Sequence, residues 1–179
     1  IIDSLCCLDE TAKAIGAGNT LVKTDKGWKG YNTDVFGFNT SIKPFLKGRH
    51  ERALIFGTGG AAKAVDYSLK RLGIETVLVS RSPVVGQIGY NEITTEALAH
   101  YLMIVNCTPQ GTWPKTDECV DIPWDGIGEK HFAMDLVYNP EETTFIKRAK
   151  ARGAFAMNGS DMLRLQAERS LEVWLEHGL

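Results

Sequence analysis

The spacing of apolar and polar positions along the chain changes near Arg52. Beyond that point, short uninterrupted apolar runs alternate with segments in which apolar residues recur every three or four positions. Uninterrupted runs are typical of strands buried on both faces, and the longer spacing is typical of amphipathic helices. Their regular alternation predicts an α/β fold with a doubly wound parallel sheet. The predicted strands are 53–56, 76–79, 102–105, 132–137 and 154–156, and the predicted helices are 61–72, 95–100, 141–152 and 161–177.

Turn and cap residues mark the ends of several elements. The part of the chain before Arg52 predicts a helix at 8–15 closed by Gly16, strands at 19–24 and 28–31 around an Asp25-Lys26-Gly27 turn, and a helix at 33–46. Later in the chain, Asn139 can cap a helix that has Pro140 at its first position and Glu142 at its third. This arrangement predicts a helix start at residue 140.

Composition and charge exclude several classes of protein. Hydrophobic residues make up 44% of the 179 residues and charged residues 23%, as in globular chains. The net charge of −2 argues against binding to nucleic acid or to an anionic membrane, and the apolar runs are too short to span a bilayer. The four cysteines and four histidines are too scattered for a disulfide framework or a metal site. We expect a cytoplasmic protein, because no signal peptide is visible, and a fragment, because the chain starts Ile1-Ile2-Asp3 without a methionine.

A glycine-rich turn connects the first apolar strand of this region to the helix that follows it. Its residues are Gly57, Thr58, Gly59, Gly60, Ala61 and Ala62, which match the pattern G-x-G-x-x-A. In this pattern the first glycine makes a tight turn, the second lets a diphosphate approach the backbone, and the third small residue keeps helix and strand close. The free N–H groups of the helix start then bind the anion. Glycines also end strands without binding anything, but a turn placed between a buried strand and an amphipathic helix favours a dinucleotide site.

The end of the next strand indicates which dinucleotide is bound. NAD-binding proteins place an acid there, roughly 20 residues past the turn, to bind the ribose 2′-hydroxyl. This chain has Ser80, Arg81 and Ser82 instead, with no acid nearby. A guanidinium binds phosphate with two parallel hydrogen bonds, which favours the 2′-phosphate of NADP. The alternative is an ordinary solvated loop arginine.

Further segments occur in the order of one known family. They are Gly16-Ala17-Gly18-Asn19-Thr20, Gly30-Tyr31-Asn32-Thr33-Asp34, the turn at 57–62, Ser80-Arg81-Ser82, Val105-Asn106-Cys107-Thr108-Pro109, Asp135-Leu136-Val137-Tyr138-Asn139-Pro140, and Asn158-Gly159-Ser160-Asp161-Met162-Leu163 followed by Gln166-Ala167. Together these segments resemble the shikimate dehydrogenases, and they cover nearly the whole chain.

The resemblance implies an NADP-dependent enzyme of chorismate biosynthesis that interconverts 3-dehydroshikimate and shikimate in a cleft between two domains. It implies that Asn19, Asp34 and Gln166 hydrogen-bond the substrate hydroxyls, and that Tyr138 lines the same cleft. Asp34 would also pair with the catalytic lysine of the family. The implied cofactor-binding residues are Gly57, Thr58, Gly59, Gly60, Ala61, Ala62, Ser80, Arg81, Ser82, Asn106, Thr108, Leu136 and Gly159.

The chain also departs from the family pattern. The family's lysine motif and its serine motif for the substrate carboxylate are both missing, and Lys13, Lys23 and Lys63 are better interpreted as solvated side chains. Ser160-Asp161 replaces a leucine-glycine pair, which puts a carboxylate near the expected nicotinamide end. We therefore expect this chain to bind NADP(H) but to be nearly inactive.

These observations lead to a predicted domain division. Residues 1–33 are interpreted as the remnant of a second α/β domain, which binds substrate. Residues 34–158 are the Rossmann-like NADP domain, and residues 159–179 form a helix that returns to the substrate domain. The exposed edge of the remnant, with Cys6, Cys7 and Trp28, suggests a possible homodimer.

Two other functions stay open. One is a relative that oxidises quinate with NAD, which Arg81 and the missing acid argue against. The other is a non-catalytic NADP(H)-binding module, which the missing initiator methionine argues against, because a natural short protein would begin with one.

Overall fold

A six-stranded parallel sheet forms the larger part of the computed structural model, which describes residues 5–178. Its strands are β4 (Arg52–Phe56), β5 (Glu75–Ser80), β6 (Gln87–Gly89), β7 (Met103–Asn106), β8 (Phe132–Asp135) and β9 (Phe155–Met157). They lie in the order β6-β5-β4-β7-β8-β9, and every neighbouring pair is parallel. The order reverses direction at β4, as in doubly wound dinucleotide-binding sheets. The predicted fold class is confirmed.

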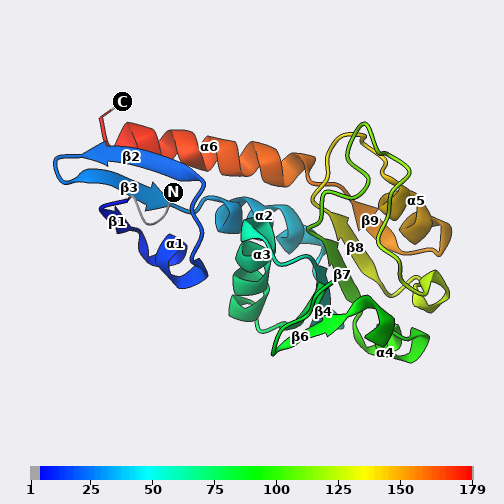
Figure 1. The fold of residues 1–179 in the computed structure, drawn as a ribbon. Helices are drawn as coiled ribbons and strands as arrows, with labels where there is room; N and C mark the ends of the chain where they lie inside the picture. The colour runs from blue at the N-terminus through cyan, green and yellow to red at the C-terminus, as the bar shows by residue number, and fades with distance from the viewer. Residues whose placement is uncertain (1–4, 179) are drawn as a thin grey trace.

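Helices cover both faces of this sheet (Figure 1). They are α2 (Asp34–Ile42), α3 (Gly60–Arg71), α4 (Thr95–His100), α5 (Thr144–Ala151) and α6 (Ser160–Glu176). Phe38 of α2, Leu69 of α3 and Met162 of α6 are buried in one core cluster. Leu98 of α4 and Phe145 of α5 belong to a second cluster. The sheet therefore has a hydrophobic core on each face, which explains why its strands are apolar without interruption.

A smaller sheet lies at the far end of α6 (Figure 1). It contains β1 (Cys7–Leu8), β2 (Thr20–Thr24) and β3 (Gly27–Tyr31) in the order β1-β3-β2, and β2 and β3 form the predicted antiparallel hairpin. The short helix α1 (Glu10–Ile15) is capped by Asp9, which accepts a 2.7 Å hydrogen bond from the Ala12 amide. The predicted domain segments 1–33 and 159–179 include residues 1–4 and 179, which lie outside the described residues.

Two predicted element boundaries are wrong. The helix predicted at 33–46 ends as an α-helix at Ile42 and continues as a 3-10 turn over Lys43–Phe45, because Pro44 has no N–H group to extend it. The helix predicted to start at 140 starts at Thr144. Its cap is Thr143, whose hydroxyl accepts from the Ile146 amide at 3.3 Å. That hydroxyl also donates to the buried carboxylate of Asp135, which holds the cap in place.

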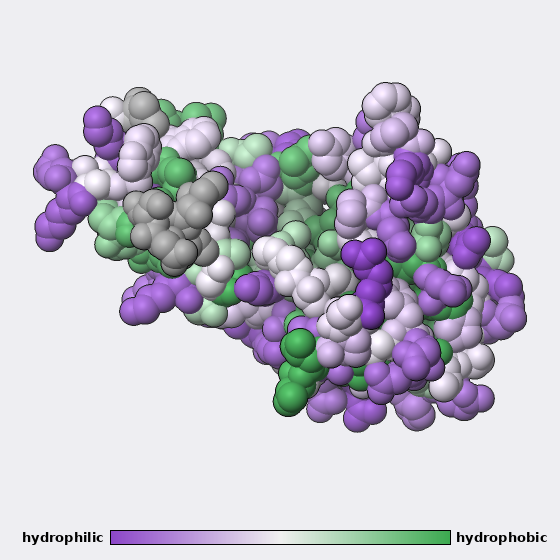
Figure 2. Space-filling model, in the orientation of Figure 1, coloured by the Kyte–Doolittle hydropathy of each residue, from purple (hydrophilic) through white to green (hydrophobic). Residues whose placement is uncertain are grey.

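The face of the molecule shown in Figure 2 is mostly hydrophilic, with apolar surface only in separate small areas. Among residues 5–178, no helix combines the length and apolar character needed to cross a membrane. Nor do these residues contain a group of three or more His, Cys, Asp or Glu side chains placed to hold a metal ion.

Candidate cofactor and substrate site

The glycine-rich turn adopts a conformation that only glycine allows at its first position. Gly57 follows β4 with a φ of +109°, and its amide donates to the Val79 carbonyl of β5 at 2.9 Å. A Cβ at this position would lie 3.2 Å from the carbonyl oxygen of Cys107. The turn is therefore held close to the ends of β5 and β7, at the point where the strand order reverses and where such sheets bind their ligands.

Thr58, Gly59 and Gly60 are open toward solvent, whereas Ala62 is buried in the core below them. Gly59 is the N-cap of α3, and a Cβ built on it meets no atom within 4 Å. The first amides of α3 have no carbonyl partners within the helix, so they are available to an anion. A groove of about 800 Å³ lies in front of Gly57, Thr58 and Gly59. This open approach to backbone N–H groups fits the diphosphate of a dinucleotide.

Arg81 lies on the wall of the same groove. It follows β5 directly and is exposed, and Ser80 and Ser82 line the groove beside it. The Ser82 amide donates to the Ser80 hydroxyl at 3.2 Å, which fixes the short turn that carries Arg81. The three residues predicted to bind a 2′-phosphate are thus brought together at one end of the groove.

A second hollow of about 390 Å³ continues from the groove at Cys107, Thr108 and Pro109, which line both. Its far wall includes Leu136 and Tyr138, which follow β8. The Tyr138 side chain is 51% exposed. The two hollows adjoin each other at their three shared residues, and between them they are lined by Arg81, the start of the glycine-rich turn, Leu136 and Tyr138.

Asn106 was predicted as a cofactor-binding residue, but its side chain lies under the groove rather than in it. It is 1% exposed, and its amide donates to the Asp135 carboxylate at 2.9 Å. Its side-chain oxygen accepts hydrogen bonds from the backbone and hydroxyl of Thr108, at 3.0 and 2.6 Å. Asn106 therefore positions Thr108, which does line the groove.

Gly159, the N-cap of α6, packs against the segment that follows β8. A Cβ on Gly159 would lie 2.2 Å from the carbonyl oxygen of Leu136, so no larger residue fits without moving the backbone. Asp161, in the first turn of α6, is exposed and ion-paired with Arg164 at 3.3 Å. Its carboxylate is thus held along the helix by Arg164.

The predicted substrate residues Asn19, Asp34 and Gln166 meet in one cluster. The Asn19 amide donates to the Asp34 carboxylate at 2.9 Å and to the Gln166 carbonyl oxygen at 3.2 Å. Burial raises the pKa of Asp34 above its ordinary value, and the hydrogen bond from Asn19 partly opposes this. These residues come from the loop before β2, the start of α2 and the middle of α6. Three segments distant in the sequence thus place amide and carboxylate groups together, where they can both donate and accept hydrogen bonds.

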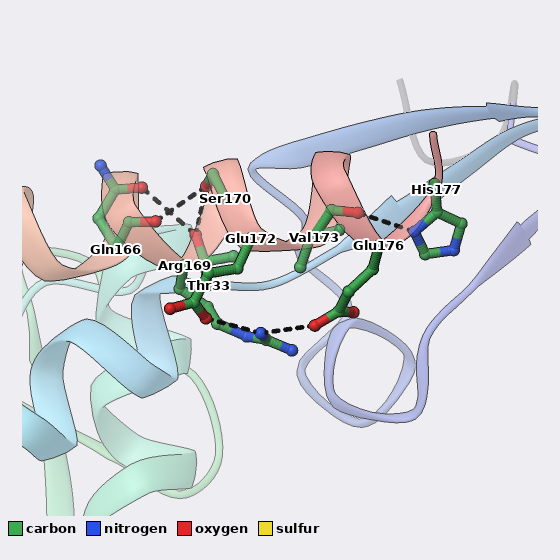
Figure 3. A network of polar contacts seen from close by, with 8 residues as sticks. All are labelled: Thr33, Gln166, Arg169, Ser170, Glu172, Val173, Glu176 and His177. Carbon is green, nitrogen blue, oxygen red and sulfur yellow. Dashed lines mark hydrogen bonds and ion pairs between the residues drawn. The ribbon is translucent and has the colours of Figure 1, made fainter. Parts of the chain in front are cut away.

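A buried set of hydroxyls supports this cluster and was not predicted. The hydroxyls of Thr20 and Ser170 are 2.7 Å apart, and those of Thr33 and Ser170 are 3.0 Å apart. Figure 3 shows Ser170 and Gln166 on the same side of α6, facing Thr33. Ser170 follows Gln166 by one helical turn, and that spacing was the available sequence signal.

The segment before the cluster packs against the glycine-rich turn. A Cβ on Gly60 would lie 3.6 Å from the Ala17 side chain, and the Ala17 carbonyl accepts from the Asn32 side chain at 3.0 Å. On the other side, α2 and α6 pack so closely that a Cβ on Gly37 would lie 2.6 Å from the Met162 carbonyl oxygen. Lys13, Lys23 and Lys63 are exposed, as predicted.

Replacing Gly59 by alanine is expected to weaken NADPH binding with little effect on the stability of the fold. Its φ of −74° suits alanine and its Cβ would enter open space, so stability should fall only by the cost of alanine at an N-cap, about 1 kcal/mol. The added methyl group would occupy the approach to the helix amides and weaken NADPH binding about tenfold or more. Isothermal titration calorimetry with NADPH and a thermal melt measure the two effects. Gly48→Ala, also in open space but outside the groove, is the control, and unchanged binding in Gly59→Ala would contradict the prediction.

The fold and the groove define a class of protein, the dehydrogenase domains that bind a dinucleotide across a doubly wound sheet. The chain is 37% identical to the NADP-dependent shikimate dehydrogenase of Crocosphaera subtropica over 98% of its own length and 68% of that protein's length. It superposes on a chorismate mutase/shikimate 5-dehydrogenase fusion protein of Clostridium acetobutylicum with a TM-score of 0.83 and 35% identity, covering 98% of this chain and 66% of that one.

A third comparison is with the shikimate 5-dehydrogenase of Thermus thermophilus, whose structure holds NADP(H) and shikimate. The TM-score is 0.83 and the identity 28%, over 97% of this chain and 67% of that one. No protein-family model matches the chain. The chain belongs to the shikimate dehydrogenase family and spans about two thirds of the length of these relatives.

Proposed function

We propose that this chain provides the NADP(H)-binding part of a shikimate dehydrogenase, the enzyme that reversibly reduces 3-dehydroshikimate to shikimate. The observation that carries the proposal is the pair of adjoining hollows lined by Arg81, Gly57 and Tyr138. The separate Asn19–Asp34–Gln166 cluster, on the loop before β2, α2 and α6, supports it. NADPH, when bound, supplies a hydride from its nicotinamide ring. The residues proposed to bind it are the glycine-rich turn, Arg81 with its flanking serines, and the segments that carry Thr108, Leu136 and Gly159.

The proposed roles of the polar cluster follow from its groups. Reduction of a ketone adds a hydride to carbon and a proton to oxygen, so the site must hold the substrate hydroxyls and deliver a proton. Asn19 offers amide hydrogens and Gln166 an amide oxygen, which suits neighbouring hydroxyls. Asp34 is proposed to hold a further hydroxyl and the group that carries the proton. Among residues 5–178, no lysine is ion-paired with Asp34.

The function is tested by measuring binding and turnover in the same chain. We expect NADPH to quench tryptophan emission, because Trp113 is exposed and follows Thr112, which lines the second hollow. Binding should be at least about tenfold tighter for NADPH than for NADH, since only NADPH carries a phosphate for Arg81. We expect little or no NADP reduction with shikimate, because these residues contribute no proton carrier beside Asp34.

Three outcomes separate the possibilities. Turnover with shikimate that Asp34→Ala abolishes would establish the activity in this chain and reveal another proton carrier. Preferential NADPH binding without turnover would support the cofactor half of the proposal. Equal binding of NADH and NADPH, or binding of neither, would overturn the proposal.

Several finer statements are part of the same proposal. They are the place in chorismate biosynthesis, the cytoplasmic location, and the domain division at 33/34 and 158/159. A homodimer through the smaller sheet, where Cys6, Cys7 and Trp28 are exposed, is a further element of it.

A further inference from the structure

The groove has a second positively charged residue that no sequence motif indicated. Arg81 lines it on the side of β5, and Lys115 lines it from the long loop after β7, together with Glu118 and Cys119. These are the three charged residues among the described lining residues, two of them basic and one acidic. The cofactor's phosphates would therefore enter a space with one cation on the strand side and one on the loop side.

The loop that carries Lys115 is anchored to the core rather than free. The Thr116 carbonyl accepts a 2.9 Å hydrogen bond from the Thr144 hydroxyl at the start of α5. The Lys115 amide donates to the Thr112 carbonyl at 2.9 Å. Gly111, with a φ of +89°, allows the chain to pass close to Glu118, whose carbonyl oxygen would lie 3.3 Å from a Cβ there. The backbone of Lys115 thus has a defined place on the groove wall.

Within this loop Lys115 is paired with Glu118. Their Nζ and Oε1 atoms are 3.0 Å apart, and the side chains are 73% and 47% exposed. Exposed pairs of this kind contribute little, typically between about 0 and 1 kcal/mol. A phosphate group, with more charge and three acceptor oxygens, can therefore replace the Glu118 carboxylate as the partner of Lys115.

We propose that Lys115 is a second binding residue for the 2′-phosphate of NADP(H), together with Arg81, and that Glu118 competes with that phosphate for it. The inference rests on the proposed cofactor. The diphosphate common to NADH and NADPH belongs at the first amides of α3, and Lys115 lines the same groove as Arg81. The group that distinguishes NADPH from NADH, and for which Arg81 is proposed, is the 2′-phosphate.

The test compares NADPH and NADH binding in single variants of the 179-residue chain. Lys115→Met keeps the length of the side chain and removes its charge, and we expect it to weaken NADPH binding about fivefold to tenfold at low salt while leaving NADH unchanged. Glu118→Gln removes the competing carboxylate, and we expect it to strengthen NADPH binding about twofold to threefold. Lys130→Met, which also removes an exposed charge but before the start of β8, should change neither affinity.

The outcomes distinguish a failure of the Lys115 inference from a failure of the proposed function. An equal loss for NADH and NADPH in Lys115→Met would place Lys115 at the shared diphosphate and overturn the inference, as would no loss for either. Arg81→Met serves as the reference. If it abolishes the NADPH preference while Lys115→Met has no effect, the proposed function stands and the inference fails. A wild-type chain that binds no NADPH would overturn both.

Discussion

Replacing Gly159 by alanine is expected to lower the free energy of unfolding by about 3 kcal/mol or more, at the upper end of what overpacking costs. The φ of Gly159 is −81°, which alanine adopts freely, so the loss comes from space alone. A new Cβ would lie 2.2 Å from the Leu136 oxygen and 2.7 Å from its carbonyl carbon. Both clashing groups are backbone, and neither can rotate away as a side chain would.

Urea denaturation of the variant and the wild type measures this loss. Gly59→Ala is the matched control, because it adds the same methyl group at a helix N-cap where nothing lies within 4 Å. To relieve the clash, the start of α6 must move away from the segment after β8, and α6 carries Gln166. We therefore expect weaker NADPH binding as well. A variant that unfolds within about 0.5 kcal/mol of the control, the usual range for neutral substitutions, would contradict the close packing described here.

The sheet could be predicted because its pattern is local. Five of its six strands, and most of the helices that cover it, are predicted by short apolar runs and amphipathic spacing, which depend on neighbouring residues only. Two strands were missed for a physical reason. β1 has two residues and β6 three, and segments that short carry too few alternating positions to give a pattern.

The site was predictable where a function depends on sequence neighbours and not where it depends on tertiary contacts. The glycine-rich turn and Ser80-Arg81-Ser82 are each one short segment, and the structure places both on the groove. Lys115 lies in a loop with no periodicity, so its place on the groove wall depends on where the Thr144 hydroxyl holds the chain. The sequence pattern indicates Asn139 as the cap of α5, but the cap is Thr143. The bond that anchors Thr143 to Asp135 is visible only in three dimensions.

Asp135 is expected to make the stability of the protein depend on pH. It is fully buried at the end of β8, and burial raises its pKa to about 6, although Thr143, Val137 and Asn106 donate hydrogen bonds to it. A carboxyl whose folded pKa exceeds its unfolded value of 3.8 binds its proton more tightly in the folded state. Its contribution to stability is therefore complete below about pH 4 and is lost as the pH rises through about 6. At 1.36 kcal/mol per pKa unit, the loss is on the order of 3 kcal/mol.

The variant Asp135→Asn isolates this effect, because its amide has the shape of the protonated acid and can keep the bonds from Val137 and Asn106 while facing the Thr143 hydroxyl. Unfolding free energies are measured by denaturant titration between pH 4 and pH 7 for the variant, the wild type and the exposed control Asp121→Asn. Between pH 4 and pH 7, the unfolding free energy of Asp135→Asn minus that of the wild type should rise by on the order of 3 kcal/mol. The same difference for Asp121→Asn should rise much less, because only the buried group must ionise away from water.

A difference between Asp135→Asn and the wild type that stays constant with pH would mean that Asp135 ionises in the folded protein as easily as in water. In that case the hydrogen bonds from Asn106, Val137 and Thr143 would fully offset its burial. Of these three bonds, the one from Asn106 links Asp135 to the groove, because the Asn106 side-chain oxygen holds Thr108.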